Sequence, residues 1–113
     1  MKTIIAGSRN ITDYELVKTT LQNLKITITE VVSGTANGVD ELGERYAIEF
    51  GLPIDPFPAD WEKYGKSAGY IRNQEMADNA EALVAFWDGK SRGTKNMIDI
   101  ATEKGLKVKI VKY

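Results

Sequence analysis

The segment EVVSGTANGVD, residues 30–40, joins a short apolar run to a glycine loop and then to the start of an amphipathic stretch. The apolar run, residues 30–33, has the length of a buried strand. Beyond the loop, apolar side chains recur at the spacing of one helix face, at Val39, Leu42, Tyr46 and Phe50. The segment therefore predicts a strand that leads through a glycine loop into a helix.

The same alternation of strand and helix extends over the whole chain. Four other apolar runs have the length of a strand: Thr3–Ala6, Ile54–Phe57, Leu83–Trp87 and Lys107–Val111. Helical spacing recurs between them, at Tyr14, Val17, Leu21 and Leu24, and at Thr94, Met97, Ile98 and Ala101. Thr12 or Asp13 can cap the first of these helices, whereas residues 58–67 are expected to form a long irregular loop.

Strict alternation of strands and helices indicates a parallel sheet, because right-handed crossovers place helices on both of its faces. We expect a Rossmann-like α/β fold with five parallel strands in the order 3-2-1-4-5, formed by residues 1–113 as one domain. The first and fourth strands then lie side by side where the winding reverses. Ligands bind in the crevice at the carboxyl ends of such strands.

The composition excludes several kinds of chemistry. The chain has neither cysteine nor histidine, which excludes Ser-His and Cys-His catalysis and the usual zinc ligands. Its 15 basic and 16 acidic residues give a net charge of -1, so nucleic-acid binding, which needs a broad basic field, is disfavoured. No apolar run is long enough to span a bilayer, and we expect a cytoplasmic protein that has no membrane partner.

Unusual residues collect in the loops that follow the strands, and only those loops face the crevice. Gly7-Ser8-Arg9 follows the first strand, residues 33–40 include the loop after the second, and Pro58-Ala59-Asp60-Trp61 follows the third. The fourth strand leads into residues 88–94, Asp-Gly-Lys-Ser-Arg-Gly-Thr. Glycine before a helix start exposes backbone N–H groups at the positive end of the helix dipole, which favours phosphate. Glycines after strands are also common as plain turn residues, and that interpretation stays open for each loop taken singly.

Two of these loops differ in charge. The helix after the second strand opens with Asp40 and Glu41, whereas the fourth loop is basic, with Lys90, Arg92 and Lys95. We therefore expect a phosphate at the fourth loop and ribose hydroxyls that donate to Asp40. In the alternative interpretation, Asp40 and Glu41 only satisfy the helix dipole.

Arg72 lies in a segment with helical spacing. Gly69, Arg72, Asn73 and Met76 share one helix face, so the guanidinium lies beside a small or apolar surface. A guanidinium in that place suits a bidentate contact with phosphate. The alternative is that its head pairs with a nearby acid, Glu75 or Asp78.

Aromatic and acidic residues add further expectations. Trp61 can stack on a base, whereas Trp87 is expected in the core or in the wall of the crevice. A divalent ion can accompany a phosphate near acidic residues, here Asp40, Asp60 or Asp88.

The motifs form a recognisable set: Gly7-Ser8-Arg9, Ser33-Gly34-x-Ala36-x-Gly38-Val39-Asp40, Ala59-Asp60-Trp61, Gly69-x-x-Arg72-Asn73-x-x-Met76, and Ala85-Phe86-Trp87-Asp88-Gly89-x-Ser91-x-Gly93-Thr94. Together they resemble the YspA-like branch of the SLOG superfamily. The resemblance implies a Rossmann-like fold and a relation to the LOG phosphoribohydrolases, which release a base from a nucleoside monophosphate, and to the DprA proteins, which handle single-stranded DNA. It also implies nucleotide sensing, a phage or mobile-element origin and a homo-oligomer.

Residues can be matched to the LOG enzymes one by one. Arg72 and Met76 are similar to the LOG motif Arg-Lys-x-x-Met, whose Arg acts in the site, with Asn73 in place of the Lys. Gly93-Thr94 resembles the end of the LOG phosphate loop, and Met97 stands where that motif has its catalytic Glu. Methionine cannot stabilise the oxocarbenium-like state of N-glycosidic cleavage as a carboxylate does.

The resemblance therefore favours a sensor, carrier or sponge that binds a nucleotide or an ADP-ribose-like molecule. A nucleotide N-glycosidase with Arg72 in catalysis is the alternative, and DprA-like nucleic-acid binding is a further one, which the net charge disfavours. The residues expected to contact the ligand are Gly7, Ser8, Arg9, Ser33, Gly34, Gly38, Asp40, Asp60, Trp61, Arg72, Asn73, Gly89, Ser91, Gly93 and Thr94.

Overall fold

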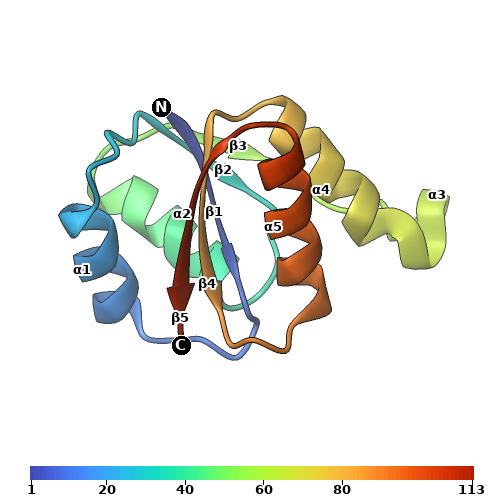
Figure 1. Ribbon diagram of the computed structural model, residues 1–113, viewed down its shortest axis with the longest axis horizontal. Helices are drawn as coiled ribbons and strands as arrows, with labels where there is room; N and C mark the ends of the chain where they lie inside the picture. The colour runs from blue at the N-terminus through green and yellow to red at the C-terminus, as the bar shows by residue number, and fades with distance from the viewer.

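Five parallel strands form one sheet in the order β3-β2-β1-β4-β5 (Figure 1). The computed structural model describes residues 1–113. The strands are β1 (Lys2–Gly7), β2 (Glu30–Ser33), β3 (Ile54–Pro56), β4 (Ala82–Trp87) and β5 (Lys107–Lys112). Because β1 pairs with both β2 and β4, the winding of the sheet reverses between β1 and β4. The predicted Rossmann-like α/β fold and its strand order are confirmed.

Helices cover both faces of the sheet. α1 (Tyr14–Asn23) and α2 (Val39–Glu49) pack on one face, and α4 (Ala68–Asp78) and α5 (Arg92–Glu103) pack on the other (Figure 1). Asp13 caps α1 by accepting a hydrogen bond of 3.2 Å from the backbone N–H of Leu16, which decides between the two expected caps. None of the helices combines the length and the apolar character that crossing a membrane requires.

Residues 58–67 are not the irregular loop that the sequence predicts. α3 (Trp61–Tyr64) and a 3-10 turn (Gly65–Ser67) occupy most of this segment and lead directly into α4. Asp60 begins α3 by accepting a hydrogen bond of 3.0 Å from the backbone N–H of Lys63. No residue of α3 is buried, so the helix leaves no apolar pattern in the sequence. The segment projects beyond the sheet at one end of the molecule (Figure 1).

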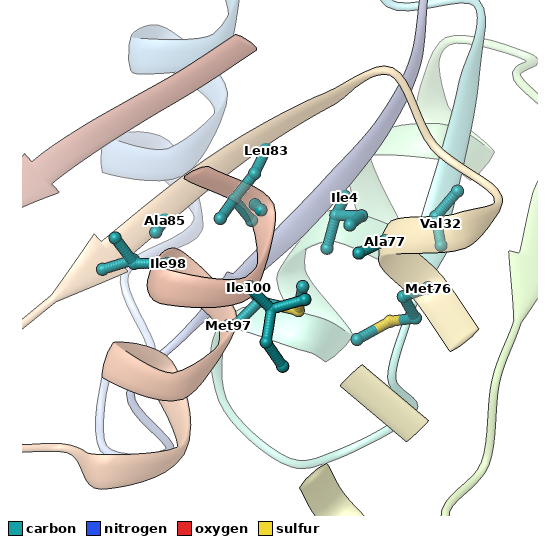
Figure 2. Packing of buried hydrophobic residues seen from close by; sticks show 11 residues of the cluster. Ile4, Val32, Met76, Ala77, Leu83, Ala85, Met97, Ile98 and Ile100 are labelled. Carbon is teal, nitrogen blue, oxygen red and sulfur yellow. The ribbon is translucent and has the colours of Figure 1, made fainter. Parts of the chain in front are cut away.

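Alternate residues of the central strand β1 enter two separate apolar clusters. Ile4 belongs to a cluster that includes Met76 of α4 and Met97 of α5 (Figure 2). Ile5 belongs to the cluster on the opposite face, with Val17 of α1 among its members. Ile4 and Ile5 are both fully buried. Strand β1 is therefore held from both sides, and this fixes the position of the loop that follows it.

α2 approaches the sheet closely at Gly43. A β-carbon at this position would lie 2.9 Å from the Cβ and the Cγ2 of Ile5, which is closer than real β-carbons come. Since Ile5 is branched at Cβ and fully buried, it has little freedom to move away. The absence of a side chain at Gly43 therefore allows α2 to pack on β1.

We expect Gly43→Ala to lower the free energy of unfolding by about 1 to 3 kcal/mol, the usual cost of overpacking a core. An alanine in a helix otherwise stabilises it by about 1 kcal/mol relative to glycine. Gly93→Ala in α5, where an added β-carbon meets nothing within 4 Å, is the matched control and should be neutral or stabilising. Urea unfolding measures both variants. Equal stability of the two would contradict this account of the packing.

Candidate functional site

A cavity of about 220 Å³ opens at the carboxyl edge of the sheet. Segments far apart in the sequence form its wall: the carboxyl end of β1, the loops after β1, β2 and β4, the start of α2, α3 with the 3-10 turn after it, α4 and α5. The residues that line it are Ala6, Gly7, Arg9, Ala36, Asp40, Trp61, Lys66, Gly69, Tyr70, Arg72, Asn73, Met76, Ser91, Gly93, Thr94 and Met97. Many of the residues predicted from the sequence to contact a ligand are therefore brought to one place.

Arg72 of α4 reaches across the cavity wall to the loop after β2. One of its terminal nitrogens, Nη1, donates a hydrogen bond to the backbone carbonyl of Gly34, and Nε donates to Oδ1 of Asn73 at 3.1 Å. A β-carbon at Gly34 would lie 2.8 Å from Arg72 Nη1 and 2.8 Å from an oxygen of Asp40. A side chain at position 34 would therefore displace the ends of the Arg72 and Asp40 side chains from their present positions.

Asp40, in the first turn of α2, brings a buried carboxyl group to the cavity. Only 7% of the residue is exposed, and one carboxylate oxygen accepts a hydrogen bond of 3.1 Å from the backbone N–H of Ala36. Burial raises the pKa of Asp40 to about 6, and Glu44 adds to the rise, while the Ala36 N–H, Arg72 and Arg9 oppose it. A carboxyl group with this pKa exchanges its proton close to neutral pH. Glu44 is itself held by the Ser33 hydroxyl, which donates to it at 2.6 Å.

Asn73 joins the two helices on its side of the sheet. Its side chain is buried, and its amide nitrogen donates to Oδ1 of Asn96 at 3.0 Å and to the backbone carbonyl of Gly93 at 3.4 Å. Its carbonyl oxygen accepts from Arg72. Asn73 lines the cavity, but its hydrogen bonds position α5 and Arg72.

The loop before α5 was expected to bind phosphate, but several of its backbone N–H groups already donate to side chains of the same loop. The Asp88 carboxylate accepts from the N–H groups of Lys90 at 2.8 Å and Ser91 at 2.9 Å, and these two contacts lower the pKa of Asp88. The Ser91 hydroxyl accepts from the N–H of Thr94 at 3.3 Å. Gly89 does not line the cavity, whereas Ser91, Gly93 and Thr94 do. The part of this segment that faces the cavity is therefore Ser91 and the first turn of α5, and not Gly89.

The start of α4 and the 3-10 turn before it contribute residues that the sequence analysis missed. Lys66 and Tyr70 line the cavity, and the N-cap of α4, Ser67, makes no hydrogen bond with its side chain. The first turn of α4 has no acidic residue, so the positive end of its dipole is not neutralised there. Trp61 of α3 is 54% exposed and lines the same cavity. Lys66 and Tyr70 were missed because the sequence analysis treated residues 58–67 as a loop and so did not locate where α4 begins.

The other predicted residues support the site from outside the cavity. Ser8 is buried, and its hydroxyl accepts from the N–H of Asp88 at 3.4 Å. Gly38 is the N-cap of α2, and Asp60 caps α3. Trp87 donates from its indole nitrogen to the carbonyl of Ser91 at 3.1 Å, which is a structural contact.

The acidic residues considered as ion ligands lie in different local settings. Asp60 caps α3 and Asp88 holds the loop before α5, while Asp40 is buried at the start of α2. The structure contains no cluster of three acidic side chains that can hold a metal ion. Met97, 1% exposed, is part of the cavity floor at the position where LOG enzymes have a carboxylate.

The fold and the cavity define a Rossmann-like α/β domain with a site at the carboxyl edge of its sheet. Residues 1–64 match the YspA, cpYpsA-related SLOG family, and the chain belongs to this family. It is also 38% identical over 84 residues to the Gene 61 protein of Mycobacterium phage D29, an alignment that covers 69% of this chain and 67% of the phage protein. No solved structure matches the chain.

The resemblance inferred from the motifs is thus confirmed, and the expectation of phage relatives fits the phage protein. The family match ends before Arg72 and before the Gly93-Thr94 loop. The roles of these residues therefore rest on the geometry of the cavity.

The raised pKa of Asp40 predicts a dependence of stability on pH. The value of about 6 lies above the ordinary 3.8, so between these pH values the folded chain holds a proton that the unfolded chain releases. The resulting stabilisation is complete below about pH 4 and is lost as the pH rises through about 6. At about 1.4 kcal/mol per pKa unit, it amounts to about 3 kcal/mol.

We expect Asp40→Asn to lack this component, because an amide oxygen can still accept from Ala36 but does not titrate. Urea unfolding between pH 4.5 and 7.5 measures the free energy of unfolding of both proteins. The wild-type value should fall with rising pH relative to that of the variant. Two parallel curves would show that Asp40 has an ordinary pKa.

Proposed function

We propose that the chain binds a nucleotide-derived small molecule that carries phosphate, in the cavity at the carboxyl edge of the sheet. The observation that supports this most strongly is the convergence of Arg9 and Arg72 on one cavity, although neither forms a salt bridge. Burial, and then the nearby Arg9, lower the pKa of Arg72, while Asp40 opposes them. An anion bound between the two arginines removes their mutual repulsion and forms charge-assisted hydrogen bonds with both.

Two helix starts add to this positive field. Gly69 lies in the first turn of α4 and Gly93 in the first turn of α5, and both residues line the cavity. The N–H groups of a first helical turn have no partner within their own helix, and the dipole favours negative charge there. Lys66 adds a side-chain cation beside α4. Phosphate oxygens can therefore be met by guanidinium, ammonium and amide donors together.

The remaining surface of the cavity suits an aromatic base. Met76 and Met97 form an apolar part of its wall and are almost completely buried. Trp61 and Tyr70 line its rim and are about half exposed, which leaves their ring faces available for stacking. A ligand with an anionic group and a flat apolar group matches both parts of the cavity, and nucleotides have this combination.

We expect Arg9→Ala to weaken binding of such a ligand about tenfold to a hundredfold, because a charge-assisted hydrogen bond contributes about 1.5 to 3 kcal/mol. Arg92→Ala is the matched control. Arg92 is exposed in the first turn of α5 but does not line the cavity, so its loss should change the affinity less than about twofold. Calorimetry against a panel of nucleoside mono- and diphosphates measures both. Absence of binding to every phosphate compound, or equal losses in the two variants, would refute the proposal.

A second candidate function is hydrolysis of an N-glycosidic bond, and the position of Asp40 favours it. Met97 cannot act as the carboxylate of LOG enzymes, but Asp40 places a carboxyl group with a pKa of about 6 on the same cavity. In this reaction the bond between C1′ and the base nitrogen breaks, water adds to C1′, and a proton reaches the base. Asp40 in its protonated form can supply that proton, and the proton that the water loses as it adds to C1′ restores the acid.

If Asp40 has this role, the wild-type chain should release free base from a nucleoside monophosphate, with a rate that falls as the pH rises through about 6. Asp40→Asn should lower the rate at least a hundredfold and leave binding of the nucleotide within a few-fold. Chromatography of the released base measures the rate, and calorimetry measures the binding. If nucleotides of the panel bind and none is hydrolysed, the hydrolase function is refuted and only the binding function remains.

A further inference from the structure

Thr35, in the loop between β2 and α2, has a backbone conformation that its residue type disfavours. Its φ of 60° lies in the left-handed region, and it is the one residue other than glycine with a positive φ. A residue branched at Cβ rarely adopts this region, so the backbone is strained there. The side chain of Thr35 is exposed, and its packing therefore does not impose the conformation. Other contacts of the loop must hold it.

The peptide groups on both sides of Thr35 are held by side chains. The group before it accepts from Nη1 of Arg72 at its carbonyl oxygen, and its N–H donates to Oγ of Ser33 at 3.1 Å. The group after it donates from its N–H to a carboxylate oxygen of Asp40 at 3.1 Å. Since peptide groups are planar, the φ and ψ of Thr35 alone set how these two planes are oriented relative to each other. Holding both planes therefore holds Thr35 in the left-handed region.

The hydroxyl of Ser33 is itself fixed in direction. Ser33 is the last residue of β2 and is fully buried, and its hydroxyl donates to Oε2 of Glu44 at 2.6 Å. A hydroxyl has a single hydrogen, so this donation leaves the oxygen lone pairs to accept from the N–H of Thr35. Ser33 therefore sets the orientation of the first peptide group, and with it the direction of the Gly34 carbonyl.

The Gly34 carbonyl in turn helps to place the guanidinium of Arg72. Nη1 donates to this carbonyl, and Nε donates to Oδ1 of Asn73. The remaining nitrogen, Nη2, makes no hydrogen bond within the chain and lies beside Gly69, where an added β-carbon would be 3.9 Å from it. Gly69 lines the cavity. The two fixed nitrogens therefore leave Nη2 at the cavity wall, where it can donate to an anion.

We propose that Ser33 and Thr35 are positioning residues for Arg72. The Ser33 hydroxyl keeps Thr35 in its left-handed conformation, and the carbonyl before Thr35 then faces the guanidinium and holds it toward the cavity. This inference rests on the proposed function and adds to it the part of the chain that orients the anion-binding group. Because Thr35 is strained, its backbone relaxes to a negative φ when Ser33 no longer accepts. The affinity for an anion then falls with the fraction of chains that still have Arg72 in place.

Calorimetry with AMP, GMP, CMP and UMP tests the proposal. For those that bind the wild type, Ser33→Ala should weaken binding about tenfold, the upper range for one hydrogen bond. Thr3→Val is the matched control, because it removes a fully buried hydroxyl of β1 that donates to the carbonyl of Met1, away from the cavity. It should change the affinity less than about twofold.

A second substitution distinguishes positioning from a structural role of Ser33 in β2. Glycine adopts a positive φ without strain, so adding Thr35→Gly to Ser33→Ala should restore the affinity to within about threefold of the wild type. Thr35→Pro, at an exposed position, fixes φ near about −65° and removes the N–H that donates to Ser33. It should weaken binding at least as much as Ser33→Ala.

NMR measures the backbone of residue 35 without any ligand. The amide and α protons of a residue with positive φ lie close together, so Thr35 should give a strong intraresidue NOE in the wild type and in Thr3→Val. The NOE should become weak in Ser33→Ala. Thermal unfolding shows whether each variant is folded.

Three results would overturn the inference and leave the proposed function standing. The first is wild-type affinity in folded Ser33→Ala and Thr35→Pro. The second is a loss of affinity in Ser33→Ala that Thr35→Gly does not reverse, and the third is an unchanged NOE of Thr35 in Ser33→Ala. Absence of wild-type binding to all four nucleotides would overturn the proposed function and this inference together.

Discussion

The parallel pairing of β1 with β4 is the constraint on which the site depends. The five residue pairs from Thr3 with Ala82 to Gly7 with Phe86 place the ends of the two strands side by side, and the N–H of Ser8 continues the ladder with a hydrogen bond of 3.1 Å to the carbonyl of Phe86. Since the winding reverses here, the helices that follow β1 and β4 leave toward opposite faces, and the loops between strand and helix separate. The hollow is a consequence of topology. Residues from both halves of the chain then line it without any long loop.

Arg72 links the helix layers on the two faces of this sheet. It comes from α4 on one face of the sheet and donates to the carbonyl of Gly34, in the loop that leads to α2 on the other face. Asn73 accepts from Arg72 and donates toward α5, so a chain of hydrogen bonds runs from the loop after β2 to the start of α5. A guanidinium fixed by two neutral acceptors loses little freedom when it binds an anion, and its charge stays available for that anion.

The alternation of strands and helices was sufficient to predict the topology, because burial of β1 on both faces leaves a continuous apolar run and the helices leave regular apolar spacing in the sequence. Arg9, Asp40, Arg72 and Thr94 could also be placed on one cavity, since they follow strands or share a helix face with Gly69. Two features had no such signal. The short helix α3 is exposed throughout, and with it Lys66 and Tyr70 were missed. The second was the use of Asp88 as an internal acceptor in the fourth loop, which depends on a backbone turn that no residue spacing reveals.

In the proposed function, the buried Asp40 would combine attraction for an anion with reversible binding. When the cavity contains no anion, the ionised carboxylate offsets the charges of Arg72 and Arg9, and both oppose the rise of its pKa. A phosphate that binds those arginines takes over that role and at the same time repels the carboxylate, so the pKa of Asp40 must rise further above 6. Binding then draws a proton onto Asp40, and the cavity exchanges an internal negative charge for that of the ligand. In this proposal the cost of burying a carboxyl group is tied to anion binding, because the group that destabilises the ionised fold near neutral pH also offsets part of the repulsion between Arg9 and Arg72.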